Sequence, residues 1–302
     1  MPEERVLIAG GSGFIGRKLT RMLQDQGYSV SWLSRSSGRV GEVSLFRWDP
    51  SRGEMDMRAL DGVDHLVVLA GAGIADKRWT KARKDLIISS RVDSAHTLQH
   101  ALANSNHNVK TITCASAVGY YGNRGEEWLD EEAEPSEGFL SYSTQRWEMG
   151  SQGFVHNGIE PAIIRIGLVL GRESGLLKEM DKQLRMGIRA IVGSGRQYYP
   201  WIHIDDICGI FIHAIENRLT GICNGVAPRP ETQNDLLKEM VKARGTFALP
   251  APAPAFVLRL MLGEMAAAVL SGQRVKADKI IESGYRFQYE QAEAALQDLY
   301  KQ

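Results

Sequence analysis

The chain has few cysteines and no excess of charge of either sign. Its three cysteines, Cys114, Cys208 and Cys223, are widely spaced and include no CxxC pair. This pattern predicts buried, reduced thiols in a cytoplasmic protein. Lysine plus arginine and aspartate plus glutamate number 36 each, so the formal net charge is zero. Without a basic field, we expect neither nucleic acid nor an anionic membrane surface as a partner.

A leader-like start and a long apolar run are also lacking. Glu3 and Glu4 stand where a secretory leader would have basic residues followed by a long apolar stretch. The most apolar late segment, residues 256–270, is interrupted by Arg259 and Glu264, so it is too short and too charged to span a bilayer. With 43% hydrophobic and 24% charged residues, the composition is typical of a soluble protein with one large core or two unequal ones.

Metal-binding patterns are weak. His96 and His100 share a helix face, but the residues between them include no glutamate that could act as a base, and no third ligand is evident. The acidic run over residues 126–134 is interpreted as a solvated loop. We therefore expect no metal site.

Short apolar strands alternate with longer helical patterns in the first half of the chain. The periodicity predicts strands and helices at the following positions. The strands are expected at 6–9, 28–33, 65–70, 111–115 and 162–166, and the helices at about 15–26 and 81–104. Continuous apolar strands joined by helices favour an α/β fold with a Rossmann-type, doubly wound parallel sheet.

A proline-rich segment marks the joint to a C-terminal helical piece. Pro250, Pro252 and Pro254 alternate with small residues, which predicts a stiff, extended connection. We expect a Rossmann domain over residues 1–165, with residues 205–227 returning to it. Residues 166–204 and 228–302 are expected to form a smaller C-terminal substrate lobe.

A glycine-rich loop follows the first predicted strand and opens the first helix. Gly10, Gly13 and Gly16 give the spacing GxxGxxG. A diphosphate can approach the backbone here because no Cβ blocks it, and the free N–H groups at the helix start, around Phe14 and Ile15, can hold it. Because the motif lies between a strand and an amphipathic helix, it predicts a dinucleotide-binding site.

The end of the second predicted strand indicates which dinucleotide binds. An acidic residue there would bind the ribose 2′-hydroxyl, whereas a basic residue accommodates a 2′-phosphate. The strand ends with Leu33, Ser34 and Arg35 and has no carboxylate. Arg35 offers a fork of donors suited to phosphate, and Ser34 adds a hydroxyl. NADP(H) is therefore the expected cofactor, although Arg35 as a solvated surface residue remains an alternative.

These motifs resemble the short-chain dehydrogenase/reductase superfamily. More narrowly, the chain is similar to the extended, NAD(P)-dependent epimerase/dehydratase-like branch, in an atypical group with a characteristic C-terminal extension. The matching stretches are residues 69–71, 74–79, 90–91, 119–122, 165–171, 193–197, 201–206, 224–228 and 272–274.

The resemblance implies several binding positions. Leu69 and Ala70 would line the adenosine and the nicotinamide ribose, and Arg91 would face the cofactor. Asp205 and Asp206 would begin a helix, where capping is favoured over catalysis.

Two loops supply polar candidates for substrate contacts, each with a structural hydrogen bond or packing as the alternative. These candidates are Lys77, Arg78 and Trp79 in the first loop, and Arg196, Gln197, Tyr199 and Trp201 in the second.

The superfamily's catalytic set is only partly matched. That set is a serine or threonine, a tyrosine, and a lysine four residues after the tyrosine, which together move a proton to or from a substrate oxygen. The serine position falls on Ala117, with Ser116 beside it, the tyrosine position on Tyr142 and the lysine position on Arg146. Ser116, Tyr142 and Arg146 are the candidate catalytic residues, and Tyr142 as an incidental helix residue remains open.

The expected function is that of an NADP(H)-dependent oxidoreductase or epimerase. Its substrate would be a small hydroxyl or carbonyl compound, sugar-nucleotide-like compounds included. The alternative is an NADP(H)-binding regulator or scaffold whose catalytic site has degenerated. The oligomeric state is open between monomer and homodimer.

Overall fold

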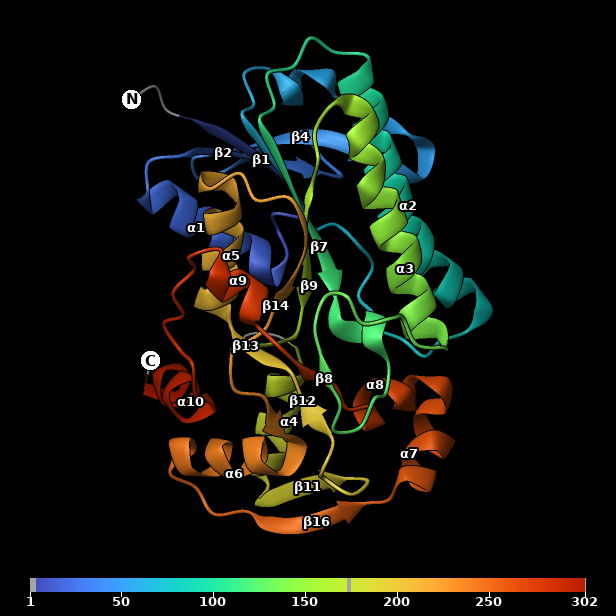
Figure 1. Ribbon diagram of the computed structural model, residues 1–302, viewed down its shortest axis with the longest axis vertical. Helices are drawn as coiled ribbons and strands as arrows, with labels where there is room; N and C mark the ends of the chain where they lie inside the picture. The colour runs from blue at the N-terminus through green and yellow to red at the C-terminus, as the bar shows by residue number, and fades with distance from the viewer. Residues whose placement is uncertain (1–3, 173–174, 302) are drawn as a thin grey trace.

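A parallel sheet lies at the centre of the protein. The computed structural model describes residues 4–172 and 175–301, and a nine-stranded sheet forms the middle of this part of the chain (Figure 1). Its strands are β1 (Arg5–Ala9), β2 (Ser29–Ser34), β3 (Gly38–Val40), β4 (Val43–Asp49), β5 (Glu54–Met55), β6 (His65–Val68), β7 (Thr111–Ala117), β9 (Ala162–Ile166) and β14 (Gly221–Gly225). They lie in the order β14-β9-β7-β6-β1-β2-β4-β3, with β5 beside β4.

The strand order reverses at β1. All neighbours from β14 to β4 are parallel, whereas β3 and β5 run antiparallel to β4. β1 has β2 on one side and β6 on the other, so the chain crosses from one half of the sheet to the other at this point. Open parallel sheets bind their ligands outside the carboxyl ends of the strands at such a reversal.

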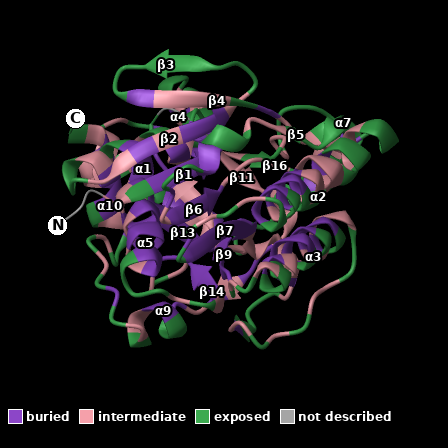
Figure 2. Cartoon of the chain, turned by 90° about the horizontal axis from the view of Figure 1, so that it is seen from above, coloured by how far each residue is buried: buried purple, intermediate pink, exposed green. Residues whose placement is uncertain are grey.

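Helices cover both faces of the sheet (Figure 1). They are α1 (Phe14–Asp25) and α5 (Ile204–Glu216) on one face, and α2 (Lys81–Ala103) and α3 (Phe139–Gln152) on the other. Seen from above, buried strands lie between these layers (Figure 2). Ile8 of β1 packs in the same cluster as Leu19, and Leu7 in the cluster that contains Leu98. The predicted α/β fold with a Rossmann-type sheet is confirmed.

A smaller part of the molecule lies below the carboxyl ends of the strands (Figure 1). Its helices are α4 (Gly175–Arg185), α6 (Gln233–Arg244), α7 (Ala255–Leu262), α8 (Ala267–Leu270) and α10 (Ala292–Lys301). Its strand pairs are β10 (Leu168–Leu170) with β13 (Trp201–His203), β11 (Ile188–Val192) with β16 (Leu249–Ala253), β12 (Tyr198–Tyr199) with β15 (Glu231–Thr232), and β8 (Trp128–Leu129) with β17 (Arg274–Val275). Leu177, Leu236 and Leu296 join α4, α6 and α10 in a third core cluster. Helix α9 (Asp278–Glu282) lies beside β14 and α5, with Ile280 in the same core cluster as Ile8 (Figure 1).

The proline-rich segment is a strand as well as a connection. Residues 249–253 pair in parallel with β11, in the register Ile188 with Leu249. Proline can lie in such a strand because only alternate residues turn their N–H groups toward the partner. The N–H of Leu249 donates to the carbonyl of Gly187, and β16 has no second neighbour that would need the missing proline donors.

The three cysteines are buried and free, as predicted. Burial raises the pKa of the Cys114 thiol to about 12, so this side chain is neutral and unreactive at ordinary pH. Among the described helices, none is both long and apolar enough to cross a membrane.

Candidate active site

The loop between β1 and α1 depends on its glycines. Gly10 has a φ of +95°, and a Cβ there would lie 2.9 Å from the backbone nitrogen of Ala70. A Cβ on Gly16 would lie 2.5 Å from the carbonyl oxygen of Gly10, so α1 could not approach the loop as closely. Gly13 caps α1 without a side-chain hydrogen bond. The first-turn N–H groups around Phe14 therefore have no side-chain acceptor, which suits a bound diphosphate.

The end of β2 lies beside this loop. Trp32 packs against Gly11, where a Cβ would come within 2.2 Å of its ring, and its indole N–H donates to Thr20 of α1. Ser34 ends the strand, and the exposed Arg35 follows it. Because Ala9 of β1 pairs with Leu33 of β2, Arg35 follows the strand that neighbours the phosphate-binding loop.

The loop after β6 closes the other side of the expected cofactor site. The N–H of Leu69 donates to the carbonyl of Ala9. This hydrogen bond holds the start of the loop beside the glycine loop. Arg91 is 8% exposed and lies behind this loop, where it donates to the carbonyl of Ala72 at 3.0 Å. Burial lowers the pKa of Arg91 to about 10. Arg91 supports the loop backbone, and a direct contact with the cofactor remains a prediction.

A cavity of about 190 Å³ opens at the carboxyl ends of β7 and β9. We call it the central cavity. Its lining residues are Val118, Gly119, Leu140, Ile166, Gly167, Leu168, Tyr199, Pro200, Ala268, Ser271 and Gln273. None of these described residues carries a charged side chain. Its position, at the carboxyl edge of the sheet, makes it the candidate substrate site.

Helix α3 contributes Leu140 to the cavity wall. A Cβ on Gly119 would lie 3.6 Å from the side chains of Leu140 and Thr144, so α3 packs closely against the turn after β7. Tyr142 is 55% exposed, because an α-helix turns about 100° per residue and two residues nearly reverse the direction of the side chain. Arg146 is exposed one turn after Tyr142. The structure does not bring Tyr142 and Arg146 to the cavity, so the geometry gives their catalytic roles no support.

Ser116 belongs to a buried ion-pair network. Its hydroxyl donates to Glu148 at 2.5 Å, and the same carboxylate accepts two hydrogen bonds from Arg165, both at 2.9 Å. Burial alone would lower the pKa of Arg165, but the hydrogen bonds and charge of Glu148 outweigh it and raise that pKa. The Ser116 hydroxyl thus already donates its proton to Glu148. It also lies apart from Tyr142, which is on the exposed side of α3.

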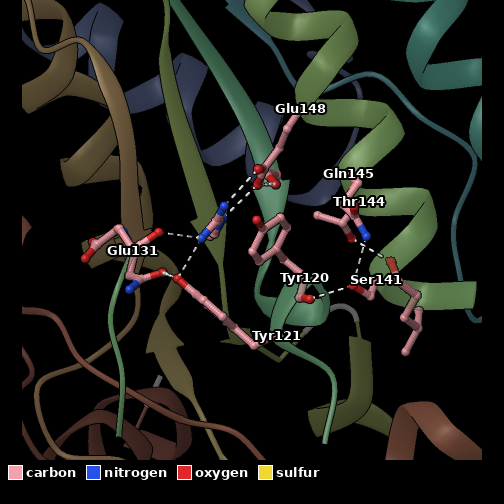
Figure 3. A network of polar contacts seen from close by, with 11 residues as sticks. Tyr120, Tyr121, Glu131, Ser141, Thr144, Gln145 and Glu148 are labelled. Atoms are coloured by element: carbon pink, nitrogen blue, oxygen red, sulfur yellow. Dashed lines mark hydrogen bonds and ion pairs between the residues drawn. The ribbon is translucent and has the colours of Figure 1, made fainter. Parts of the chain in front are cut away.

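The same network reaches Tyr121 (Figure 3) and, beyond it, strand β14 and the C-terminal region. Arg165 donates to the hydroxyl of Tyr121 at 3.0 Å, and this hydroxyl donates to Asn224 of β14 at 2.7 Å. Burial raises the pKa of Tyr121 to about 12, so the phenol stays neutral. The backbone N–H of Asn224 donates to Glu131, and its side chain donates to the carbonyl of Lys276.

The polar side chains of the second loop bond to backbone. Gln197 and Tyr199 both donate to the carbonyl of Val269, at 3.4 and 2.7 Å. Trp201 donates to the carbonyl of Arg229 at 2.9 Å. These three side chains therefore make structural hydrogen bonds, which the sequence analysis gave as the alternative to substrate contacts.

The remaining loop candidates lie mostly at the surface. Lys77, Arg78 and Arg196 are exposed. Trp79 is buried, and its indole N–H donates to the carbonyl of Ile74 at 2.8 Å. Trp79 therefore holds its own loop in place.

The two aspartates at the start of α5 have different partners. The cap is His203, whose Nδ1 accepts a hydrogen bond from the N–H of Asp205 at 3.1 Å. Asp206 is fully buried and accepts the N–H groups of Gln288 and Tyr289, at 2.8 and 3.0 Å. Asp206 thus holds the C-terminal segment against α5, a role that the local sequence did not indicate.

Comparison with known proteins agrees with this architecture. Residues 6–225, more than half of the chain, match the NAD dependent epimerase/dehydratase family. The chain belongs to this family. The epimerase-family region ends with β14, and residues 253–299 match a domain of unknown function, DUF1731.

Relatives of this epimerase-family protein match it over nearly their whole length. Epimerase family protein SDR39U1 of Mus musculus is 33% identical, over 98% of this chain and 99% of its own. Epimerase family protein YfhF of Bacillus subtilis (strain 168) is 34% identical, over 97% of both chains. The resemblance inferred from the sequence motifs is therefore confirmed.

Two solved structures are also close to this epimerase-family protein. Human epimerase family protein SDR39U1 (isoform 2) with NADPH has a TM-score of 0.88 and 30% identity, over 98% of this chain and 99% of that one. A nucleoside-diphosphate sugar epimerase of Corynebacterium glutamicum has a TM-score of 0.79 and 30% identity, over 99% of this chain and 59% of that one.

Proposed function

We propose that this protein binds NADP(H) and is an oxidoreductase or epimerase for small hydroxyl or carbonyl compounds. The observation that carries the proposal is the glycine loop, whose shape a Cβ at Gly10 or Gly16 would destroy, with Arg35 beside it. The family is described as NAD dependent, and the human relative was solved with NADPH, which supports the same cofactor class here. A cytoplasmic location fits the three buried thiols.

Each part of the site would have a separate role. The N–H groups of Phe14 and Ile15 would hold the diphosphate, and Ser34 and Arg35 would hold the 2′-phosphate. Leu69 and Ala70 would form the wall beside the ribose. When bound, NADP(H) supplies or accepts a hydride.

The proposal includes a division of labour between two parts of the chain. Residues 1–165 and 205–227 would bind the cofactor, and residues 166–204 and 228–302 would bind the substrate. The pairing of β14 with β9 supports the return of the chain to the large sheet.

A regulator or scaffold that binds NADP(H) is the second candidate. The observation that favours it is the composition of the cavity wall, to which α3 contributes Leu140. None of the described lining residues has a side chain that titrates near neutral pH. Oxidation of bound NADPH on addition of a carbonyl library would favour the enzyme. Tight cofactor binding without any oxidation of NADPH would favour the regulator.

Titration of NADPH and NADH against Arg35→Ala tests the cofactor assignment. We expect wild type to prefer NADPH, and the variant to lose about 1–3 kcal/mol of NADPH binding, the scale of hydrogen bonds to a charged group. Binding of NADH should change little. Arg286→Ala, at an exposed arginine near the C-terminus, is the matched control and should change neither affinity. Equal losses for both cofactors in Arg35→Ala would refute a 2′-phosphate contact.

A further inference from the structure

One wall of the central cavity comes from the region that matches a domain of unknown function. Ala268, Ser271 and Gln273 lie within residues 253–299 and line the cavity together with Leu140 and Ile166 of the Rossmann part. The C-terminal region is therefore part of the candidate substrate site.

The rest of the cavity wall is mainly hydrocarbon. Val118, Leu140, Ile166 and Leu168 contribute apolar side chains, and the described lining includes no cation that could pair with a phosphate or carboxylate. An anion placed here would give up part of its hydration and meet no counter-charge in the described lining. The cavity therefore favours an uncharged ligand.

Basic residues gather in a different cavity. Arg17, Lys18, Arg21 and Arg172 line a depression along α1 together with Asp205 and Asp298, and Lys18 pairs with Asp205 at 2.7 Å. Charged side chains of both signs thus line this depression, whereas the described lining of the central cavity has none.

Two polar side-chain ends in the central cavity remain without a protein partner. The Tyr199 hydroxyl does have a partner, because it donates to the carbonyl of Val269. The Ser271 hydroxyl and the Gln273 amide make no side-chain hydrogen bond to another described residue, although Gln273 is only 8% exposed. Neither side chain is among the buried polar groups that lack a partner, so both polar ends are accessible from the cavity, where a ligand or water can bond to them.

The backbone holds these two residues in place. Gly272 lies between them, and a Cβ there would come within 2.9 Å of the backbone nitrogen of Tyr198. The N–H of Gly272 donates to Asn123 at 3.0 Å, and the N–H of Gln273 donates to the carbonyl of Tyr198 at 3.1 Å. Both side chains line the cavity from this anchored segment, two residues apart.

We propose that the central cavity binds a small, uncharged carbonyl compound whose oxygen accepts hydrogen bonds from Ser271 and Gln273. This inference rests on the proposed function and names its substrate class. Ligand cavities for drug-sized molecules usually span about 300–1,000 Å³, so a cavity of about 190 Å³ suits a smaller molecule. Two donors on the oxygen polarise the C=O bond toward hydride addition at carbon.

The implied reaction balances with NADPH as the reductant. The carbonyl carbon gains a hydride and the C=O π pair moves to oxygen, which takes a proton from water. The products are an alcohol and NADP⁺. Ser271 and Gln273 hold the oxygen throughout and need not ionise, which agrees with a site that lacks the usual tyrosine and lysine pair.

Ligand-observed saturation-transfer NMR on the full chain tests this substrate class, with and without saturating NADPH. The probes are cyclohexanone, 4-oxocyclohexane-1-carboxylate and UDP-glucose. We expect cyclohexanone to bind at least tenfold more tightly than its carboxylate analogue, and UDP-glucose not to compete with it. Equal or tighter binding of either anionic probe, or no binding of cyclohexanone, would overturn the inference.

Variants in the C-terminal wall test the two donors. Ser271→Ala and Gln273→Leu should each weaken cyclohexanone binding about two- to tenfold, the effect of losing one neutral hydrogen bond. Gln291→Leu, at an exposed glutamine outside the cavity, is the matched control. Unchanged binding in both cavity variants would overturn the assignment of the donors.

A variant that changes which probe binds best does not depend on a loss of binding, so poor folding cannot imitate its result. Ala268→Arg places a cation in the cavity and should make 4-oxocyclohexane-1-carboxylate the preferred probe. A variant with the fold of wild type by circular dichroism and no change of preference would contradict the proposed location.

NADPH affinity is measured separately by fluorescence. Binding of NADPH without cyclohexanone would refute only this inference, whereas cyclohexanone binding without NADPH would refute only the proposed cofactor.

Discussion

Gly16 shows how a single missing Cβ joins a helix to the phosphate-binding loop. We predict that Gly16→Ala forces α1 away from the loop, because the new Cβ would lie 2.5 Å from the carbonyl oxygen of Gly10. NADPH affinity should fall at least tenfold, since the first-turn N–H groups move with the helix. Titration of NADPH measures the effect.

Gly150→Ala is the control for this change. Its Cβ would meet nothing closer than 3.6 Å, and alanine is favoured over glycine inside a helix by about 1 kcal/mol. This variant should keep full NADPH affinity and unfold at a slightly higher temperature. Unimpaired NADPH binding in Gly16→Ala would show that the loop does not need its present shape.

His203 gives the stability a dependence on pH. Burial lowers its pKa below the ordinary value, and the nearby Asp205 and Asp298 only partly offset this. The unfolded chain therefore binds a proton more readily as the pH falls through about 6.5, and stability is lost in that direction. Urea unfolding at pH 5.5 and 7.5 measures the change in the free energy of unfolding.

The comparison variant is His203→Asn, which keeps a good helix cap but cannot titrate. Its stability should change less than that of wild type between the two pH values, by up to about 1.4 kcal/mol for each pH unit. Identical pH dependence in both proteins would show that His203 contributes nothing to it.

Local sequence revealed some site residues and concealed others. The glycine loop could be predicted because each glycine has a local steric reason. Spacing along the chain points to Ser116 and Tyr142, but spacing does not reveal which side of a helix faces a cavity. Leu140 lines the cavity, yet an apolar side chain gives no chemical signal by itself.

Helix α3 depends on the buried pair between Glu148 and Arg165. We predict that Glu148→Gln destabilises the protein by about 3–5 kcal/mol, because Arg165 would remain buried without its counter-charge. Ser116 would also lose its anionic acceptor. Chemical denaturation measures the loss.

Tyr142→Phe on the same helix is the matched control, since its side chain is 55% exposed. Its stability should change by less than about 0.5 kcal/mol. A loss for Glu148→Gln no larger than that of Tyr142→Phe would show that the buried ion pair does not support α3.

Secondary structure was predictable where periodicity is strong. The strand at 162–166 was predicted with its observed bounds, and helices α1 and α2 lie within one residue of the predicted ranges. For β16 the local sequence indicates only an extended connection, because its prolines give no sign of the pairing with β11. That pairing joins segments about 60 residues apart, which local propensity cannot reveal.

At the scale of the whole molecule, the central cavity forms where distant segments meet. Turns after β7 and β9 provide one side, and the C-terminal region provides the other. The Rossmann sheet was predictable from alternating strands and helices, since each element carries its own pattern. The cavity was not, because its walls come from segments that share no local signal.

A crystal structure of the protein with NADPH tests the central claim most directly. The account predicts diphosphate oxygens at about 2.7–3.2 Å from the N–H nitrogens of Phe14 and Ile15, a normal hydrogen-bond distance. The guanidinium of Arg35 should contact the 2′-phosphate, and the nicotinamide should face the central cavity. NADPH bound elsewhere, with the glycine loop closed by side chains, would contradict the account.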